Sequence, residues 1–145
     1  MSQPTELWRP SADAIARSSV TRLARKASDL SGTQIADYKA LHAWSIKNLD
    51  AFWNLVWDDA GIVGDKGAGA YQAGDSFIDS HFFPDAQINV AENILGRGAD
   101  DRVAIVSILE DGTRTELTWK ELRTKVAAAT AAMRAEGITT GDRVC

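Results

Sequence analysis

Two histidines and one cysteine are the side chains in this sequence that most readily act as a general base or a nucleophile. His42 lies in a stretch with helical spacing, His81 precedes a Phe-Phe-Pro segment, and Cys145 is the last residue. Such chemistry requires a partner within hydrogen-bond reach, and none stands at a telling position. We interpret both histidines as structural or surface residues and assign Cys145 no role as a nucleophile.

Two pairs of adjacent aspartates could offer oxygen ligands to a metal ion. Asp58-Asp59 closes a predicted helix, and Asp100-Asp101 lies in a predicted turn. Adjacent carboxylates in such places usually face solvent, whereas a hard cation needs several oxygen ligands that converge on one point. We predict metal binding at neither pair.

A glycine-rich stretch from 58 to 74 can be tested as a phosphate-binding loop. A P-loop requires Gly-Lys followed by Ser or Thr, but Lys66 follows Asp65. A dinucleotide fingerprint that began at Gly67 would require a glycine at the position of Gln72. The stretch also lacks the alternating acidic ligands and the late glutamate of a calcium loop. We expect a mobile connector.

The first strong helical pattern carries basic side chains on one face. Ser11 fits an N-cap, apolar residues recur at helical spacing as far as Leu30, and Ser31-Gly32 ends the pattern. The basic face could bind a phosphate or remain solvated, and we favour the solvated face. Its residues are Arg17, Arg22, Arg25 and Lys26.

An aromatic stripe follows this helix along the chain. A shorter helical stretch begins at Thr33, a turn spans 45–48, and Asn48 is placed to cap a third helix. Such a stripe is typical of a packing surface rather than a cofactor site, and it must be covered by the domain's own core or by a neighbour. The stripe on the third helix consists of Phe52, Trp53 and Trp57.

The second half mixes helical and strand patterns. Asn89 is placed to cap a short helix from Val90 to Leu95, with Glu92 in its first turn. Val103 to Leu109 predicts a largely buried strand, and Asp111-Gly112 predicts a tight hairpin turn.

A returning strand and a capped helix come next. Arg114 to Leu117 predicts the strand, and Thr118 with Glu121 three residues later fits a capping box. Gly137 is placed to close the helix, and Val144 reads as the first residue of a further strand. Because domains rarely stop at such a point, we expect the sequence to be truncated within the opening of an α/β domain.

The composition is that of a soluble folded protein. The 145 residues are 45% hydrophobic and 25% charged, with a formal net charge of −4. This acidic balance argues against a general nucleic-acid binder. A single cysteine and the lack of any long apolar run favour a soluble protein of the reducing cytoplasm, with no membrane partner.

Several segments resemble those of adenylate-forming acyl-CoA synthetases. Leu117-Thr118-Trp119-Lys120-Glu121-Leu122 is similar to a recurrent motif of that superfamily, which usually has Tyr at the place of Trp119. Gly137-Ile138 and Gly141-Asp142-Arg143-Val144 continue the likeness. The motif is structural, because it supplies a capped helix start, aromatic packing and a glycine-closed helix end.

The first half narrows the resemblance to acetoacetyl-CoA synthetases. Leu7-Trp8-Arg9-Pro10-Ser11 resembles their entry segment, and so do the stretch from Tyr38 to Ile46 and Phe52-Trp53. The segment from Phe82 to Leu95 is similar to one shared with acetyl-CoA synthetases. Those relatives usually have Trp-Phe where this chain has Phe82-Phe83, and Gly where it has Asp85.

The resemblance implies an acetoacetate–CoA ligase that uses ATP, Mg²⁺ and coenzyme A, and that forms an acyl-adenylate before the thioester. In the family, the groups that perform this chemistry lie downstream of position 145. The resemblance therefore carries over no catalytic, cofactor-binding or metal-ligating residue, and we expect the fragment alone to be inactive and to bind none of these cofactors.

The resemblance also implies a domain organisation. We expect a helical N-terminal extension of the acetyl-CoA synthetase type at 1–97 and the incomplete start of an α/β AMP-dependent ligase domain at 98–145. The remainder of the same chain would then pack on the aromatic stripe. One alternative is a fragment of an acetyl- or propionyl-CoA synthetase. Another, from a different class, is a complete non-catalytic helical interaction module that binds through the stripe.

Overall fold

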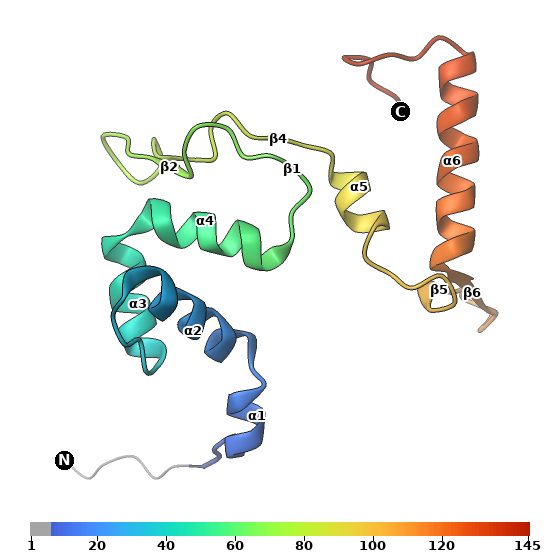
Figure 1. Ribbon diagram of the computed structural model, residues 1–145. Helices are drawn as coiled ribbons and strands as arrows, with labels where there is room; N and C mark the ends of the chain where they lie inside the picture. Colours follow the sequence, from blue (N-terminus) through green and yellow to red (C-terminus); the bar gives the residue numbers. More distant parts are fainter. Residues whose placement is uncertain (1–6) are drawn as a thin grey trace. The chain divides into compact units, whose positions relative to one another are not determined.

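The computed structural model describes residues 7–145 and divides the chain into two compact units, Met1–Ile88 and Asn89–Cys145. The first unit contains helices α1 to α4 and short strands, and the second contains helices α5 and α6 and a hairpin, as can be followed in Figure 1. In chain order the elements are α1 Ala12–Ala16, α2 Ser19–Ser31, α3 Tyr38–Lys47, α4 Leu49–Ala60, β1 Gly64–Asp65, β2 Tyr71–Gln72, β3 His81–Phe82, β4 Gln87–Ile88, α5 Val90–Leu95, β5 Val103–Ile108, β6 Arg114–Thr118 and α6 Trp119–Ala135.

The first predicted helix is broken into α1 and α2. Ser11 caps α1 by accepting a hydrogen bond from the Ala14 N–H, as predicted, but the helix ends before Arg17. Ser18 then caps α2 by accepting from the Thr21 N–H. Ser18 explains the break, because its side chain accepts a backbone hydrogen bond at a place where the apolar pattern alone would continue the helix. Gly32 ends α2 in the left-handed conformation.

The core of the first unit lies among α2, α3 and the segment between them. The small side chains of Ala24 and Ala27 let neighbouring elements approach α2 closely, and Ala27 is fully buried. Ile35 and Leu41, 6% and 5% exposed, complete the buried cluster. Apolar burial of this kind is what holds the three-helix arrangement of α2, α3 and α4 together.

The boundaries of α3 differ from those the sequence predicts. The helix begins at Tyr38, because Asp37 accepts from the Ala40 N–H, and not at Thr33. It continues through the predicted turn as far as Lys47. Asn48 makes no capping bond to α4; its amide group instead donates to the Trp44 carbonyl at 2.9 Å. Asn48 therefore stands at the N-cap position of α4, as predicted, but its side chain does not supply the capping hydrogen bond.

The stretch between α4 and α5 is paired backbone and not an unstructured connector. β1 pairs with β4, and β2 pairs with β3, both antiparallel. Asp50 on α4 fixes this segment, since its carboxylate accepts from the N–H groups of Ala70 and Tyr71 at 2.7 and 3.2 Å. No local sequence pattern predicts this contact, because its partners lie 20 or more residues apart.

The second unit follows its predicted element order closely. Asn89 caps α5, and β5 and β6 form an antiparallel hairpin closed at Asp111-Gly112, where Gly112 has a φ of 82°. Thr118 and Glu121 form the predicted capping box of α6. After α6, Gly137 takes a φ of 84° and the Ile138 N–H donates to the Met133 carbonyl, which closes the helix.

Two expectations for this unit were wrong. β5 is exposed and not largely buried, with Ile108 at 68%. The reason is that the hairpin packs against only α6, so most of its apolar surface has no cover within residues 89–145. Val144 lies in no strand, because the residues after Asp142 are irregular.

The described residues form a mixed α+β structure, as predicted for the start of an adenylate-forming enzyme. Among residues 7–145, no helix combines the length and the apolar character that crossing a membrane demands.

Candidate functional site

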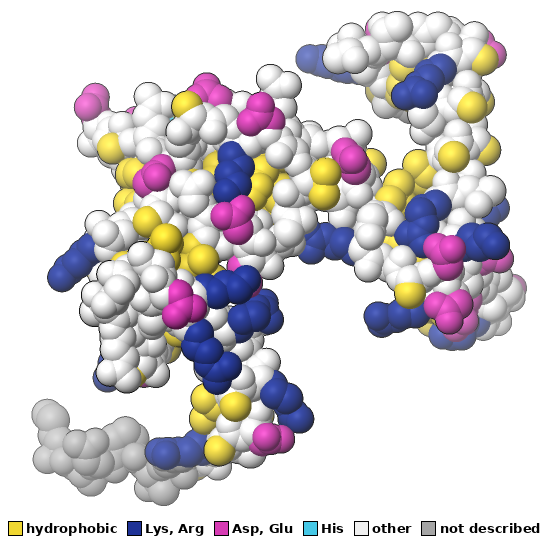
Figure 2. All heavy atoms as spheres, in the orientation of Figure 1, with side chains coloured by type: hydrophobic (Ala, Val, Ile, Leu, Met, Phe, Trp, Pro, Cys, Tyr) yellow, Lys and Arg dark blue, Asp and Glu magenta, His cyan; other side chains and the backbone are white. Residues whose placement is uncertain are grey.

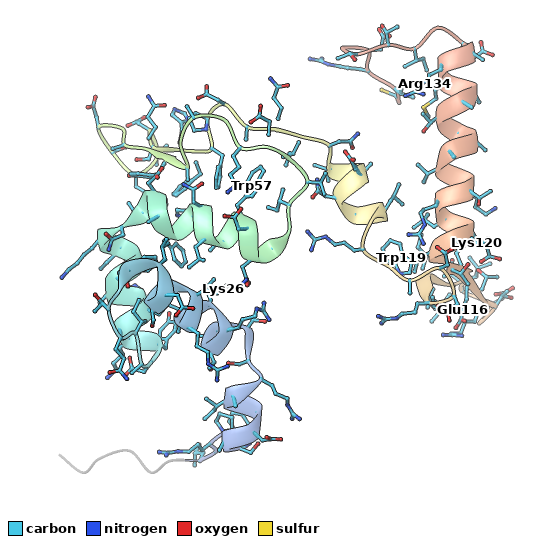
Figure 3. All side chains as sticks on the ribbon, in the orientation of Figure 1. Lys26, Trp57, Glu116, Trp119, Lys120 and Arg134 are labelled. Carbon is cyan, nitrogen blue, oxygen red and sulfur yellow. The ribbon has the colours of Figure 1, made fainter. Side chains whose placement is uncertain are left out.

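The densest charge cluster of the first unit joins α2 to α4. The Asp59 carboxylate accepts two hydrogen bonds from Arg22, from Nε at 3.1 Å and Nη2 at 3.0 Å, and it forms an ion pair with Lys26 Nζ at 2.8 Å. Asp59 is 13% exposed, whereas Arg22 and Lys26 are about half exposed. Arg22 and Lys26 lie one turn apart on α2, so both reach the same carboxylate. Figure 3 labels Lys26 on α2.

The electrostatic effect of this cluster is strong. Hydrogen bonds from Arg22 and then from Lys26 hold the pKa of the Asp59 carboxyl far below its usual range, and the same contacts raise the pKa of Arg22. Two of the three basic residues on α2, Arg22 and Lys26, are therefore already neutralised in part by a carboxylate. The cluster acts as a tie between helices, and its charges are not arranged to receive a phosphate.

Two of the other candidate carboxylates, Asp58 and Asp100, also contact cations of the chain. Asp58 pairs with Lys66 Nζ at 2.6 Å, and Asp100 pairs with Arg123 Nη2 at 2.5 Å. Over the part of the chain that the structure describes, no group of three or more His, Cys, Asp or Glu side chains converges as metal ligands would. The pairing of Lys66 with Asp58 gives that lysine a structural contact inside the glycine-rich stretch.

Both histidines belong to the first unit, and the cysteine belongs to the second. His42 stacks on Tyr38 with ring centroids 6.3 Å apart, and its side chain is exposed on α3. His81 is exposed in β3 and pairs through its backbone with Gln72. Cys145 is exposed in the second unit. Neither of these histidine contacts joins an imidazole to a nucleophile.

The aromatic stripe of α4 packs against other rings of the first unit. Trp57, only 6% exposed, packs against Phe83 with centroids 4.8 Å apart, and Trp53 meets Phe82 edge-on at 5.1 Å. Figure 3 shows Trp57 on the side of α4 that faces the short strands. The stripe is thus covered in large part by the domain's own core. This was one of the two alternatives left open by the sequence.

A groove lies on the first unit beside α1 and α2. Its volume is about 720 Å³, and its apolar lining includes Ile15, Val20 and Ile35. Arg25, Asp29 and Asp37 also line it, so its charged side chains carry more acid than base. A groove of this size can receive apolar side chains, but it holds none of the general-base or nucleophile candidates.

Arg123 joins three segments of the second unit and was not among the residues singled out from the sequence. Its guanidinium donates to the carbonyl of Leu95 at 2.6 Å and to that of Gly98 at 3.1 Å, besides pairing with Asp100. It thereby fixes the segment that enters the hairpin onto α6. No local pattern signals this role, because the acceptors lie 23 to 28 residues earlier.

Charge on the surface is mixed. Figure 2 shows Lys and Arg side chains interspersed with Asp and Glu over the visible face of both units. Such a distribution agrees with the net charge of −4 and differs from the basic stripe of a nucleic-acid-binding protein.

Comparisons with known proteins identify a family and several enzymes to which this chain is similar. Residues 38–94 match the family described as acetyl-coenzyme A synthetase N-terminus. An acetoacetyl-coenzyme A synthetase of Rhizobium meliloti (strain 1021) is 39% identical over 139 residues, which cover 95% of this chain and 21% of that protein.

Two further relatives extend the comparison. An acetoacetyl-CoA synthetase of Xenopus tropicalis is 38% identical, covering 78% of this chain and 17% of its own length. The malonamoyl-CoA synthetase vrtB of Penicillium aethiopicum is 31% identical, covering 95% of this chain and 20% of its own length. The chain therefore spans about a fifth of the length of the relatives it matches.

Proposed function

We propose that the chain forms the N-terminal part of an acetoacetate–CoA ligase. The premise is that it belongs to the family of acetyl- and acetoacetyl-coenzyme A synthetases. The observation that supports this most is the match at 39% identity across 95% of the chain. The match to the family's N-terminal region at residues 38–94 supports the placement at the start of the enzyme.

The proposed reaction has two steps. The carboxylate of acetoacetate attacks the α-phosphate of ATP, which gives acetoacetyl-adenylate and diphosphate. The thiol of coenzyme A then attacks the acyl carbon and displaces AMP. Mg²⁺ and cationic side chains would neutralise the phosphates in the first step.

We expect the residues of this chain to take no part in binding ATP, Mg²⁺ or coenzyme A, and the ion pairs of the candidate carboxylates support this. Asp58, Asp59 and Asp100 are each paired with cations of the chain, and Lys66 contacts Asp58. We therefore assign no step to any residue of this chain and place its contribution in the scaffold. The fragment alone is proposed to be inactive.

The proposal includes a domain organisation and a location. Residues 1–97 form the acetyl-CoA-synthetase-type extension, and 98–145 begin the ligase domain. The remainder of the enzyme packs on the half-exposed side chains of the aromatic stripe, Phe52 and Trp53. The enzyme works in the cytoplasm, where its single cysteine in this region would stay reduced.

The acyl substrate is the part of the proposal that most needs an experiment. The coding sequence should be extended in frame beyond Cys145, and the longer protein assayed for AMP and thioester formation. Acetoacetate, acetate, propionate and malonamate should be compared, because one relative is named for malonamoyl-CoA. We expect acetoacetate to give the highest kcat/KM and residues 1–145 alone to give no activity.

Other outcomes would redirect the assignment. Preference for acetate or propionate would move the enzyme to a sister group, and preference for malonamate would favour the fungal relative's substrate. A stop codon after Cys145, with a monomeric and cooperatively folded product, would favour the stand-alone interaction module instead.

A further inference from the structure

The loop between β2 and β3, residues 74–80, is closed by its own side chains. The Ser80 hydroxyl accepts from the Gly74 N–H at 3.2 Å and donates to the Ser76 carbonyl at 3.1 Å. The Ser76 hydroxyl donates to the Asp79 carboxylate at 2.6 Å. A Cβ at Gly74 would collide with the Asp79 backbone, so only glycine permits this closure. The loop is therefore fixed in shape by several independent contacts.

The tip of this loop presents two large apolar side chains to solvent. Phe77 is 81% exposed and Ile78 is 89% exposed, although the backbone around them is held by the hydrogen bonds just described. Side chains that project from a pre-shaped loop lose little conformational freedom of the backbone when they bind. Aromatic and aliphatic anchors of this kind typically fill a pocket on a partner.

The charges around the tip restrict the partner. Asp75 and Asp79 flank the two apolar residues, and residues 73–85 contain no Lys or Arg. An acidic rim is attracted to a basic surface and is repelled by an anionic lipid surface. The occupied pocket should therefore be apolar with Lys or Arg at its edge.

The groove on the same unit is a poor match for this loop. Its charged lining residues are Asp29, Asp37 and Arg25. If a second copy inserted Phe77 there, the carboxylates beside its loop tip would meet the two carboxylates of the groove. Like charges placed together across an interface oppose association. Docking into another copy of this chain is accordingly disfavoured.

We propose that the loop of residues 74–80 docks the first unit onto the remainder of the ligase, with Phe77 and Ile78 inserted into an apolar pocket that has a basic rim. This rests on the proposed function, because the ligases that the chain resembles are about five times its length and so include a large protein body besides this region. The loop is distinct from the aromatic stripe, whose side chains are largely covered within the first unit.

Hydroxyl-radical footprinting with mass spectrometry tests this without an activity assay. Labelling of Phe77 and Ile78 is compared between the 145-residue chain and the protein extended beyond Cys145. Because these side chains are 81% and 89% exposed in the short chain, their burial on docking should clearly lower their labelling in the longer protein. Phe83 is the internal control, because it already packs on Trp57 and should be labelled alike in both proteins.

The outcomes separate docking from substrate choice. Equal labelling of Phe77 in both proteins overturns the docking, even if the longer protein forms acetoacetyl-CoA. If Phe77 is protected but the longer protein prefers a carboxylic acid other than acetoacetate, the docking stands and only the proposed acyl substrate is overturned. Protection of the 145-residue chain by phosphatidylcholine vesicles, or by raising its concentration, would instead assign the loop to a membrane or to a second copy, and would overturn the proposal.

A variant gives a second measurement. In the longer protein, replacing Phe77 and Ile78 together by Ser should lower the midpoint of thermal unfolding, whereas Leu30→Ser, at a side chain 59% exposed on α2, should leave it nearly unchanged. In the 145-residue chain, the double replacement should have little effect, because both side chains face solvent there. An equally large loss in the short chain would show that the two residues serve the unit's own fold and not docking.

Discussion

At the scale of single residues, Asp59 ties α2 to α4 through charge. Its carboxylate meets Arg22 in a two-bond geometry and Lys26 from the next turn, and it is largely shielded from solvent. Charge-assisted bonds of this kind orient two helices more specifically than apolar contact does. The contact complements the small buried alanines of α2, which fix how closely neighbouring elements approach but not their register.

The Asp59 pairs predict an acid-sensitive stability for the first unit. Because hydrogen bonds from Arg22 and Lys26 lower the folded-state pKa of Asp59, its contribution is present above its unfolded pKa of about 3.9 and is lost as the pH falls further. Asp59→Asn should reduce the stability measured by urea unfolding at pH 7. It should also flatten the decline of stability between about pH 5 and pH 2.

Asp58→Asn is the matched control for this prediction. It removes the neighbouring carboxylate, which is 65% exposed and contacts Lys66, and it leaves the Asp59 pairs in place. Equal flattening of the pH curve in both variants would contradict a specific role for Asp59, because it would point to loss of acidic charge in general.

Residue roles were predicted only where the partners are close in sequence. The caps at Ser11, Asn89 and Thr118 were recognised because each bond spans three residues. The basic face of α2 and the aspartates of α4 were both noted, but their pairing crosses 37 residues and requires the helix packing to be known. The Phe77–Ile78 tip escaped notice for the same reason, since its exposure depends on the fold of the loop.

At the scale of elements, the start of α6 is held by a close contact as well as by its capping box. Gly98 lies so near the Trp119 ring that a Cβ there would overlap the ring atoms. The Trp119 N–H donates to the Arg102 carbonyl at 3.0 Å, and Arg123 holds the Gly98 carbonyl from one turn further on. Together these contacts fix the turn that leads from α5 into the hairpin.

Gly98→Ala should therefore destabilise the second unit, by about 1–3 kcal/mol, because the added methyl group forces the ring or the turn to move. Denaturant unfolding followed by circular dichroism measures this. In the Trp119→Ala background the same replacement should cost much less, since the ring that it strikes is gone. Additive costs in the double variant would show that Gly98 is needed for its backbone conformation and not for space.

Element order was predicted better than element boundaries. Periodicity and caps located α5, the hairpin and α6 correctly. The break between α1 and α2 was missed, because the apolar pattern runs through Ser18 and outweighs its capping signal in a sequence reading. The short strands β1 to β4 were missed because two-residue pairs leave no periodic pattern, and their register depends on contacts from α4 such as that of Asp50.

At the scale of the whole molecule, the two units differ in how well they cover their own apolar surface. The first unit buries a core among its helices and shields Trp57. In the second unit, residues 89–145 include no fully buried side chain, and β5 has one edge without a partner strand within that range. An apolar strand with an open edge is a template for pairing with another chain.

This difference predicts that the 145-residue chain associates through β5. Ile108 is 68% exposed at the end of that strand. Ile108→Lys should therefore place a charge on the exposed apolar surface of β5 and shift the sedimenting species toward the monomer mass. Ser107→Lys is the control, because neighbouring strand residues face opposite sides and it adds the same charge to the other face. If both variants dissociate the chain equally, added charge alone is responsible. If neither does, the association arises in the first unit, and the exposed hairpin is not its cause.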